Sequence, residues 1–96
     1  MRKLGVGVLG VGDMGRRHAE NLRRLVPHAQ LIAVADIDAA RAGKVAEELE
    51  IEHSYPSLDA MLENRDIQAV LIASPDKFHA EGVQAAARAG KDVLCE

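Results

Sequence analysis

The 96-residue chain has few aromatic residues and a single cysteine. Tyr55 and Phe78 are its only aromatic residues, so Val, Ile, Leu and Ala must build the core. A lone cysteine, Cys95, excludes an internal disulfide and a C-x-x-C metal or redox motif. This cysteine usage is typical of a reducing compartment, and we therefore expect a cytoplasmic protein.

Long apolar runs and excess positive charge are also missing. No run approaches the ~18 apolar residues that a membrane span needs, and no signal-peptide pattern precedes the first glycines. The net charge of −3 does not provide the basic surface that binds a nucleic-acid backbone. We therefore expect neither a membrane nor a nucleic-acid partner. With 48% hydrophobic and 28% charged residues, residues 1–96 have the composition of one globular domain.

The first third of the chain carries the most informative pattern. An apolar segment that ends at Leu9 is followed by three glycines spaced G-x-G-x-x-G, at positions 10, 12 and 15. A helical pattern, a second apolar segment and the acidic residue Asp36 come next. This order is the fingerprint of a dinucleotide-binding βαβ unit. The glycines would allow a tight turn, close approach of the backbone to a pyrophosphate, and close packing of helix on strand.

Asp36 indicates which dinucleotide is bound. A carboxylate at the end of the second strand accepts hydrogen bonds from the adenosine ribose and repels the extra phosphate of NADP. The sequence therefore predicts NAD, with NADP the weaker candidate. Arg41 could reach a 2′-phosphate, but its position one turn beyond Asp38 is typical of a solvated helix residue.

Apolar periodicity and turn residues divide the chain into alternating strands and helices. The predicted strands are Leu4–Leu9, Leu31–Ala35, Glu52–Tyr55, Ile67–Ala73 and Lys91–Cys95. The predicted helices are Asp13–Val26, Ala39–Glu50 capped by Asp38, Leu58–Asn64 capped by Ser57, and Lys77–Ala89 ended by Gly90. This alternation predicts an α/β fold, a Rossmann-type doubly wound parallel sheet in the order 3-2-1-4-5.

A second group of residues follows the fourth predicted strand. Ligands of open α/β sheets bind outside the carboxyl ends of the strands, where the strand order reverses. Ser74 and Pro75 should therefore lie beside the glycine loop and line the path from pyrophosphate to nicotinamide. The alternative is a turn that only starts the next helix.

Four ordered motifs together resemble the N-terminal domain of the glucose-fructose oxidoreductase and inositol dehydrogenase family. They span nearly the whole chain: Gly10-Val-Gly-Asp-Met-Gly-Arg-Arg-His18, Val34-Ala-Asp36, Ile72-Ala-Ser-Pro75-x-x-x-His79 and Ala89-Gly90-Lys91-x-Val93-x-x-Glu96. The resemblance implies an oxidoreductase that moves a hydride between a nicotinamide ring and a hydroxyl carbon of a sugar or polyol.

The resemblance also implies that the catalytic residues lie beyond this chain. In the family, the substrate domain follows the cofactor domain, and the last motif continues past the glutamate to a lysine that assists proton transfer. That lysine and a C-terminal substrate domain are absent here, so we expect the 96-residue chain alone to be inactive and assign it no catalytic residue. The four histidines share no ligand-like spacing, so no metal site is predicted.

The family position of His79 implies a residue that is near the nicotinamide and has a positioning role. A histidine that only begins a helix is the second interpretation, and a catalytic base is the third. The complete set of predicted cofactor-binding residues is Gly10, Gly12, Asp13, Met14, Gly15, Asp36, Ile37, Ser74, Pro75, His79 and Glu96.

Two other function classes stay open from the sequence. A methyltransferase using S-adenosylmethionine also combines a glycine loop with an acid after the second strand, but Gly15, Ser74-Pro75 and the Ala89-Gly90-Lys91 motif disfavour it. A non-catalytic nucleotide-binding module is the other alternative. For an isolated domain, we expect self-association through the open edge of the fifth strand, or through the face that would meet a substrate domain.

Overall fold

The structure, a computed structural model, describes residues 4–25, 29–73 and 79–95. Strands and helices alternate along this part of the chain: β1 (Leu4–Leu9), α1 (Asp13–Leu25), β2 (Ala29–Ala35), α2 (Ala39–Glu48), β3 (His53–Tyr55), α3 (Leu58–Leu62), β4 (Ala69–Ile72), α4 (His79–Arg88) and β5 (Asp92–Cys95). All strand pairs are parallel, and the sheet order is β3-β2-β1-β4-β5. The predicted Rossmann-type topology is confirmed.

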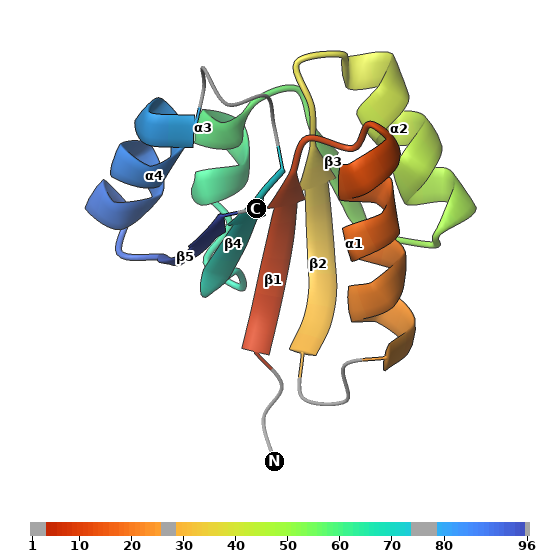
Figure 1. The fold of residues 1–96 in the computed structure, drawn as a ribbon, viewed down its shortest axis with the longest axis horizontal. Coiled ribbons are helices and arrows are strands. Elements are labelled where there is room, and N and C mark those ends of the chain that lie inside the picture. The colour runs from red at the N-terminus through yellow and green to blue at the C-terminus, as the bar shows by residue number, and fades with distance from the viewer. Residues whose placement is uncertain (1–3, 26–28, 74–78, 96) are drawn as a thin grey trace.

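The helices cover the sheet in two layers. Helices α1 and α2 pack on one face and α3 and α4 on the other, with β1 at the centre between β2 and β4 (Figure 1). Each face has its own buried cluster, the first around Val8 and Val34 and the second around Val70 and Ile72. Aliphatic side chains and alanine dominate both clusters, as the scarcity of aromatic residues predicts.

Two glycines within β1 let the second helix layer approach the sheet closely. A Cβ atom at Gly7 would lie 2.8 Å from the Met61 Sδ, and Met61 of α3 is 0% exposed. A Cβ atom at Gly5 would overlap the backbone carbonyl oxygen of Asp66. The strand is therefore glycine-rich because α3 and the turn after it occupy the space of side chains.

The end of α2 differs from the prediction. The helix ends at Glu48 rather than Glu50, because Glu50 adopts a left-handed conformation with φ 56°. The Ile51 N–H donates to the carbonyl of Ala46 at 2.8 Å, and the Glu50 N–H donates to Glu47 at 3.3 Å. This is the bonding of a Schellman motif, with glutamate in the place that glycine usually takes.

β1 covers Leu4–Leu9 as predicted, and the other element boundaries differ by no more than two residues. β2 begins at Ala29 rather than Leu31 because the polar Gln30 pairs with Gly5 of β1. β4 and α3 are shorter than predicted, covering Ala69–Ile72 and Leu58–Leu62. The caps at Asp38 and Ser57 are confirmed, since their side chains accept the N–H groups of Arg41 and Ala60 at 3.1 Å each.

The Ala89-Gly90-Lys91 motif lies at the amino end of β5, opposite the carboxyl edge of the sheet. Gly90 follows α4 with φ 77°, as the prediction of a helix stop requires. The Lys91 Nζ donates to the carbonyls of Ile67 at 2.6 Å and Asn64 at 3.1 Å. The lysine therefore ties the start of β5 to the turn before β4, and β5 begins only at Asp92.

None of the helices in the described ranges has the length and apolar character that crossing a bilayer would require. The cytoplasmic location stays a prediction from the sequence.

Candidate functional site

The carboxyl ends of β1, β2 and β4 meet at one edge of the sheet, below a cavity of about 850 Å³. The cavity brings together residues that are far apart in the chain. Its lining includes five of the predicted cofactor-binding residues, namely Gly10, Gly12, Gly15, Asp36 and Ile37. This is the position at which open α/β sheets bind their ligands.

The three glycines of the loop have three different surroundings. Gly10 has φ 89° and donates its N–H to the Ala35 carbonyl at 2.8 Å, so it makes the tight turn out of β1. A Cβ atom at Gly15 would overlap the carbonyl oxygen of Gly10 and contact the Ala73 Cβ at 3.4 Å. Gly15 is therefore the place where α1 meets the strand ends most closely.

Gly12 differs because its open side faces the cavity. Among the described residues, only the Arg41 Nη1 comes within 4 Å of a Cβ atom built at Gly12, at 3.4 Å. The Arg16 N–H donates to the Gly12 carbonyl at 2.8 Å, so the α1 hydrogen-bond ladder starts here. A diphosphate fits this geometry, since it can approach the bare backbone and the helix N-terminus.

Asp36 lies at the end of β2 and is 6% exposed. Its Oδ2 accepts the N–H of Val11 at 2.9 Å, and its Oδ1 accepts the N–H of Asp38 at 2.9 Å. Hydrogen bonds from two amides stabilise the charged carboxylate at this largely buried position. Each oxygen retains a lone pair for a ribose hydroxyl.

Arg41 extends from the first turn of α2 over the same region. Its Nη1 lies 3.9 Å from the Asp36 Oδ2, its Nη2 lies 3.7 Å from the Asp38 Oδ2, and half of its side chain is exposed. Arg41 was predicted to be a solvated residue of the helix, and its half-exposed side chain on α2 confirms this. The structure adds that the guanidinium stands between Gly12 and the two carboxylates.

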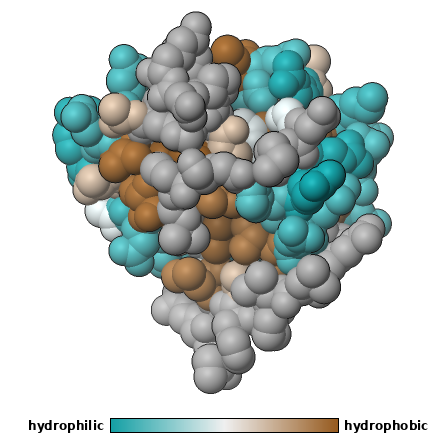
Figure 2. Space-filling view, viewed as in Figure 1, coloured by the Kyte–Doolittle hydropathy of each residue, from teal (hydrophilic) through white to brown (hydrophobic). Residues whose placement is uncertain are grey.

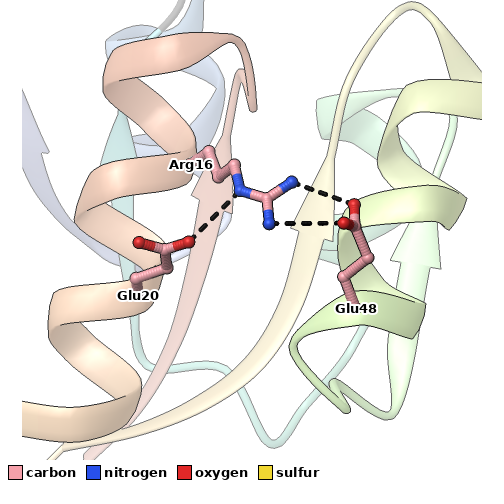
Figure 3. Close-up of polar contacts among 3 residues, drawn as sticks. All are labelled: Arg16, Glu20 and Glu48. Atoms are coloured by element: carbon pink, nitrogen blue, oxygen red, sulfur yellow. Dashed lines mark hydrogen bonds and ion pairs between the residues drawn. The ribbon is translucent and has the colours of Figure 1, made fainter.

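Arg16 follows the last glycine but is already engaged elsewhere. It donates to the Glu48 carboxylate at 2.9 and 3.4 Å and to the Glu20 carboxylate at 3.2 Å, linking α1 to α2 (Figure 3). Hydrogen bonds from Arg16 lower the pKa of Glu48, and those to Glu48 and Glu20 raise the pKa of Arg16. This network joins α1 to α2 beside the glycine loop.

A family model described as an oxidoreductase family with an NAD-binding Rossmann fold matches residues 4–96. The chain belongs to this oxidoreductase family. The resemblance inferred from the four motifs is thereby confirmed. Among relatives of the family, inositol 2-dehydrogenase of Rubrobacter xylanophilus is 48% identical over 94 residues, a match that covers 98% of this chain and 27% of the relative.

Solved structures of the family share the fold. Scyllo-inositol dehydrogenase from Lactobacillus casei, with bound NAD(H) and scyllo-inositol, superposes with a TM-score of 0.91 at 33% identity. The match covers 98% of this chain and 28% of that one. UDP-N-acetylglucosamine 3-dehydrogenase from Acidithiobacillus ferrooxidans superposes with a TM-score of 0.85 at 37% identity, over 99% of this chain and 30% of that one. The chain thus spans less than a third of these proteins.

The other predicted site residues are described only in part. Asp13 and Met14 belong to the first turn of α1, at the end of the glycine loop. His79 is the first residue of α4. Ser74, Pro75 and Glu96 lie outside the described residues, as does the predicted start of the last helix at Lys77.

The cavity also has lining residues that the sequence did not indicate as part of the site. Ser57 and Asp59 come from the start of α3, and Glu81 and Arg88 come from one side of α4. Two features of the sequence could have indicated them. Ser57 follows the end of a predicted strand, and Glu81 and Arg88 are two helical turns apart, so they lie on one side of a helix. What the sequence did not show is that α3 and α4 lie side by side at this edge (Figure 1).

Proposed function

We propose that the chain binds NAD in the cavity at the carboxyl ends of β1, β2 and β4. The observation that carries the proposal is the shared cavity, which places the open side of Gly12 and the Asp36 carboxylate together. The amides of the first turn of α1 and the backbone at Gly12 would hold the pyrophosphate, and Asp36 would hold the adenosine ribose. Asp13, Met14, Ile37, Ser74, Pro75, His79 and Glu96 complete the proposed contacts.

We propose that the oxidoreductase to which this domain belongs transfers a hydride between NAD and a hydroxyl carbon of a sugar or polyol such as an inositol. When bound, NAD supplies the hydride acceptor of that reaction. The relatives named as inositol dehydrogenases support this substrate class. Because the chain spans 27% of such a relative, we propose that these 96 residues alone bind the cofactor without oxidising myo-inositol.

Calorimetric titration tests the cofactor. We expect NAD to bind at least roughly tenfold more tightly than NADP, equivalent to about 1.4 kcal/mol, because Asp36 repels a 2′-phosphate. S-adenosylmethionine should give no heat of binding. A folded sample that binds neither dinucleotide would overturn the proposal, and preferential binding of S-adenosylmethionine would favour the methyltransferase alternative.

The Arg41→Ala variant refines the same measurement. Arg41 offsets part of the negative charge of Asp36 and Asp38, so its loss should weaken NADP binding more than NAD binding. Arg65 lies in the turn before β4, away from the cavity lining, so Arg65→Ala is a control with the same change in net charge. Equal losses of NAD and NADP affinity in Arg41→Ala would contradict this role.

We further propose that the isolated 96-residue chain self-associates through the open edge of β5 or through the face that would meet a substrate domain. β5 is at one end of the described sheet, and hydrophobic residues gather over the middle of the sheet in the view of Figure 2. An unpaired strand edge is a template for pairing with another chain. Light scattering over a concentration series should show a rising mean mass, and a constant monomer mass at high concentration would refute the proposal.

A further inference from the structure

The buried carboxylate of Asp36 connects two segments of the site. One oxygen accepts the Asp38 N–H at the start of α2, and the other accepts the Val11 N–H inside the glycine loop. Val11 is 25 residues away in the chain, and the bond between them is buried. Asp36 therefore contacts the loop directly, in addition to facing the cavity.

Two successive amides attach the loop to the end of β2. The Gly10 N–H donates to the Ala35 carbonyl at 2.8 Å, and the next amide along the chain is the one that Asp36 accepts. The Val11 side chain is 2% exposed and packs in the cluster below α1 and α2. Side chain and amide together therefore fix the residue immediately before Gly12, whose backbone faces the cavity.

We infer that Asp36 is a positioning residue for the diphosphate-binding loop as well as a contact for the ribose. The inference rests on the proposed function, because it assumes that a diphosphate binds at Gly12. A charge-assisted hydrogen bond is stronger than one between neutral groups, so the carboxylate holds the Val11 amide in place. Loss of Asp36 should then weaken ligands that have a diphosphate but no ribose hydroxyls.

The direction in which the diphosphate affinity changes when Asp36 is removed distinguishes a positioning role from charge repulsion alone. Asp36 carries a negative charge near the place proposed for a negatively charged diphosphate, so removing it without any other change should tighten diphosphate binding. Weaker binding after its removal therefore requires that the loop has lost its geometry. Asp38 is a matched control, because it is a neighbouring carboxylate that does not accept the Val11 amide.

The first experiment measures hydrogen exchange in the ligand-free chain by NMR. In Asp36→Ala the Val11 amide should exchange at least roughly tenfold faster, while the Val70 amide in the core of β4 keeps its rate. In Asp38→Asn, which keeps a helix-capping side chain, both rates should stay the same. Equal acceleration at Val11 and Val70 would mean a general loss of stability and would overturn the inference, as would an unchanged Val11 rate.

The second experiment titrates 2′,3′-dideoxyadenosine 5′-diphosphate, which lacks the ribose hydroxyls. Its affinity should fall roughly tenfold in Asp36→Ala, because small misplacements of binding groups are costly, and should rise or stay the same in Asp38→Asn. Unchanged or tighter binding to Asp36→Ala would refute the positioning role.

If the wild-type chain binds neither NAD nor this probe, the proposed function fails, and the exchange experiment still decides whether Asp36 holds the loop. Asp36→Val, which has no acceptor for the Val11 N–H but fills more space than alanine, replaces Asp36→Ala in both experiments if the alanine variant does not fold.

Discussion

The Gly15→Ala variant is expected to lose roughly 3 kcal/mol of stability or more, and to bind NAD too weakly to measure. A Cβ atom at Gly15 would overlap the carbonyl oxygen of Gly10, and that oxygen belongs to the backbone and cannot rotate away. Helix α1 would have to move off the strand ends, carrying Gly12 and its own N-terminus with it. Urea unfolding followed by far-ultraviolet circular dichroism measures the stability, and calorimetry measures the binding.

A control for this variant is available in the same chain. Gly43 lies within α2, and nothing comes within 4 Å of a Cβ atom built there. Gly43→Ala should therefore stabilise the protein by about 0.5–1 kcal/mol, because alanine is the better helix former, and should leave NAD binding unchanged. A Gly15→Ala protein with wild-type stability and NAD affinity would show that α1 can shift without cost, contrary to this account.

Helix ends show how the predictability of the fold depends on residue type. α2 and α4 end in the same hydrogen-bond pattern, with a left-handed residue just beyond the helix. At α4 that residue is Gly90, the predicted helix stop, and the helix ends at Arg88, one residue before the predicted Ala89. At α2 it is Glu50, a residue type that favours helix continuation, and the predicted helix ran two residues too far. The tertiary contact of Ile51, which packs into the buried cluster, outweighs the local preference of Glu50.

The candidate site was predictable where its chemistry is local in the sequence. The glycine spacing and the acid after β2 are both short patterns, and the structure brings them to one cavity. The contact of Asp36 with Val11 and the approach of Arg41 to Gly12 could not be predicted in this way. They depend on how closely α1, α2 and the strand ends pack, which is a property of the assembled fold.

The glycines of β1 are a second feature that is explained only by residues far away in the chain. In general, a glycine inside a strand weakens it, because it has no side chain to pack. In the structure, Gly5 and Gly7 accommodate the turn before β4 and the side chain of Met61. A strand glycine and a helix methionine, separated by more than fifty residues, therefore form one packing unit.

Met61→Ala is expected to cost about 2–5 kcal/mol, a large part of the roughly 5–15 kcal/mol that stabilises a typical domain. Met61 is 0% exposed and is among the largest fully buried side chains of the described chain, so alanine would leave a cavity against β1. Urea unfolding of the variant measures the loss. A cost below about 1 kcal/mol would mean that α3 collapses onto the sheet and fills the space.

The pairing of Met61 with Gly7 makes a second result predictable. Gly7→Ala alone should destabilise by about 1–3 kcal/mol, because its Cβ would lie 2.8 Å from the Met61 Sδ. In the Met61→Ala background the same methyl group enters the cavity, so the double variant should be at least about 1 kcal/mol more stable than the sum of the single effects predicts. Gly43→Ala, on the other face of the sheet, should add to Met61→Ala within about 0.5 kcal/mol. If Gly7→Ala were also additive with Met61→Ala, the two residues would not share the space, and the explanation for the glycine in the central strand would be wrong.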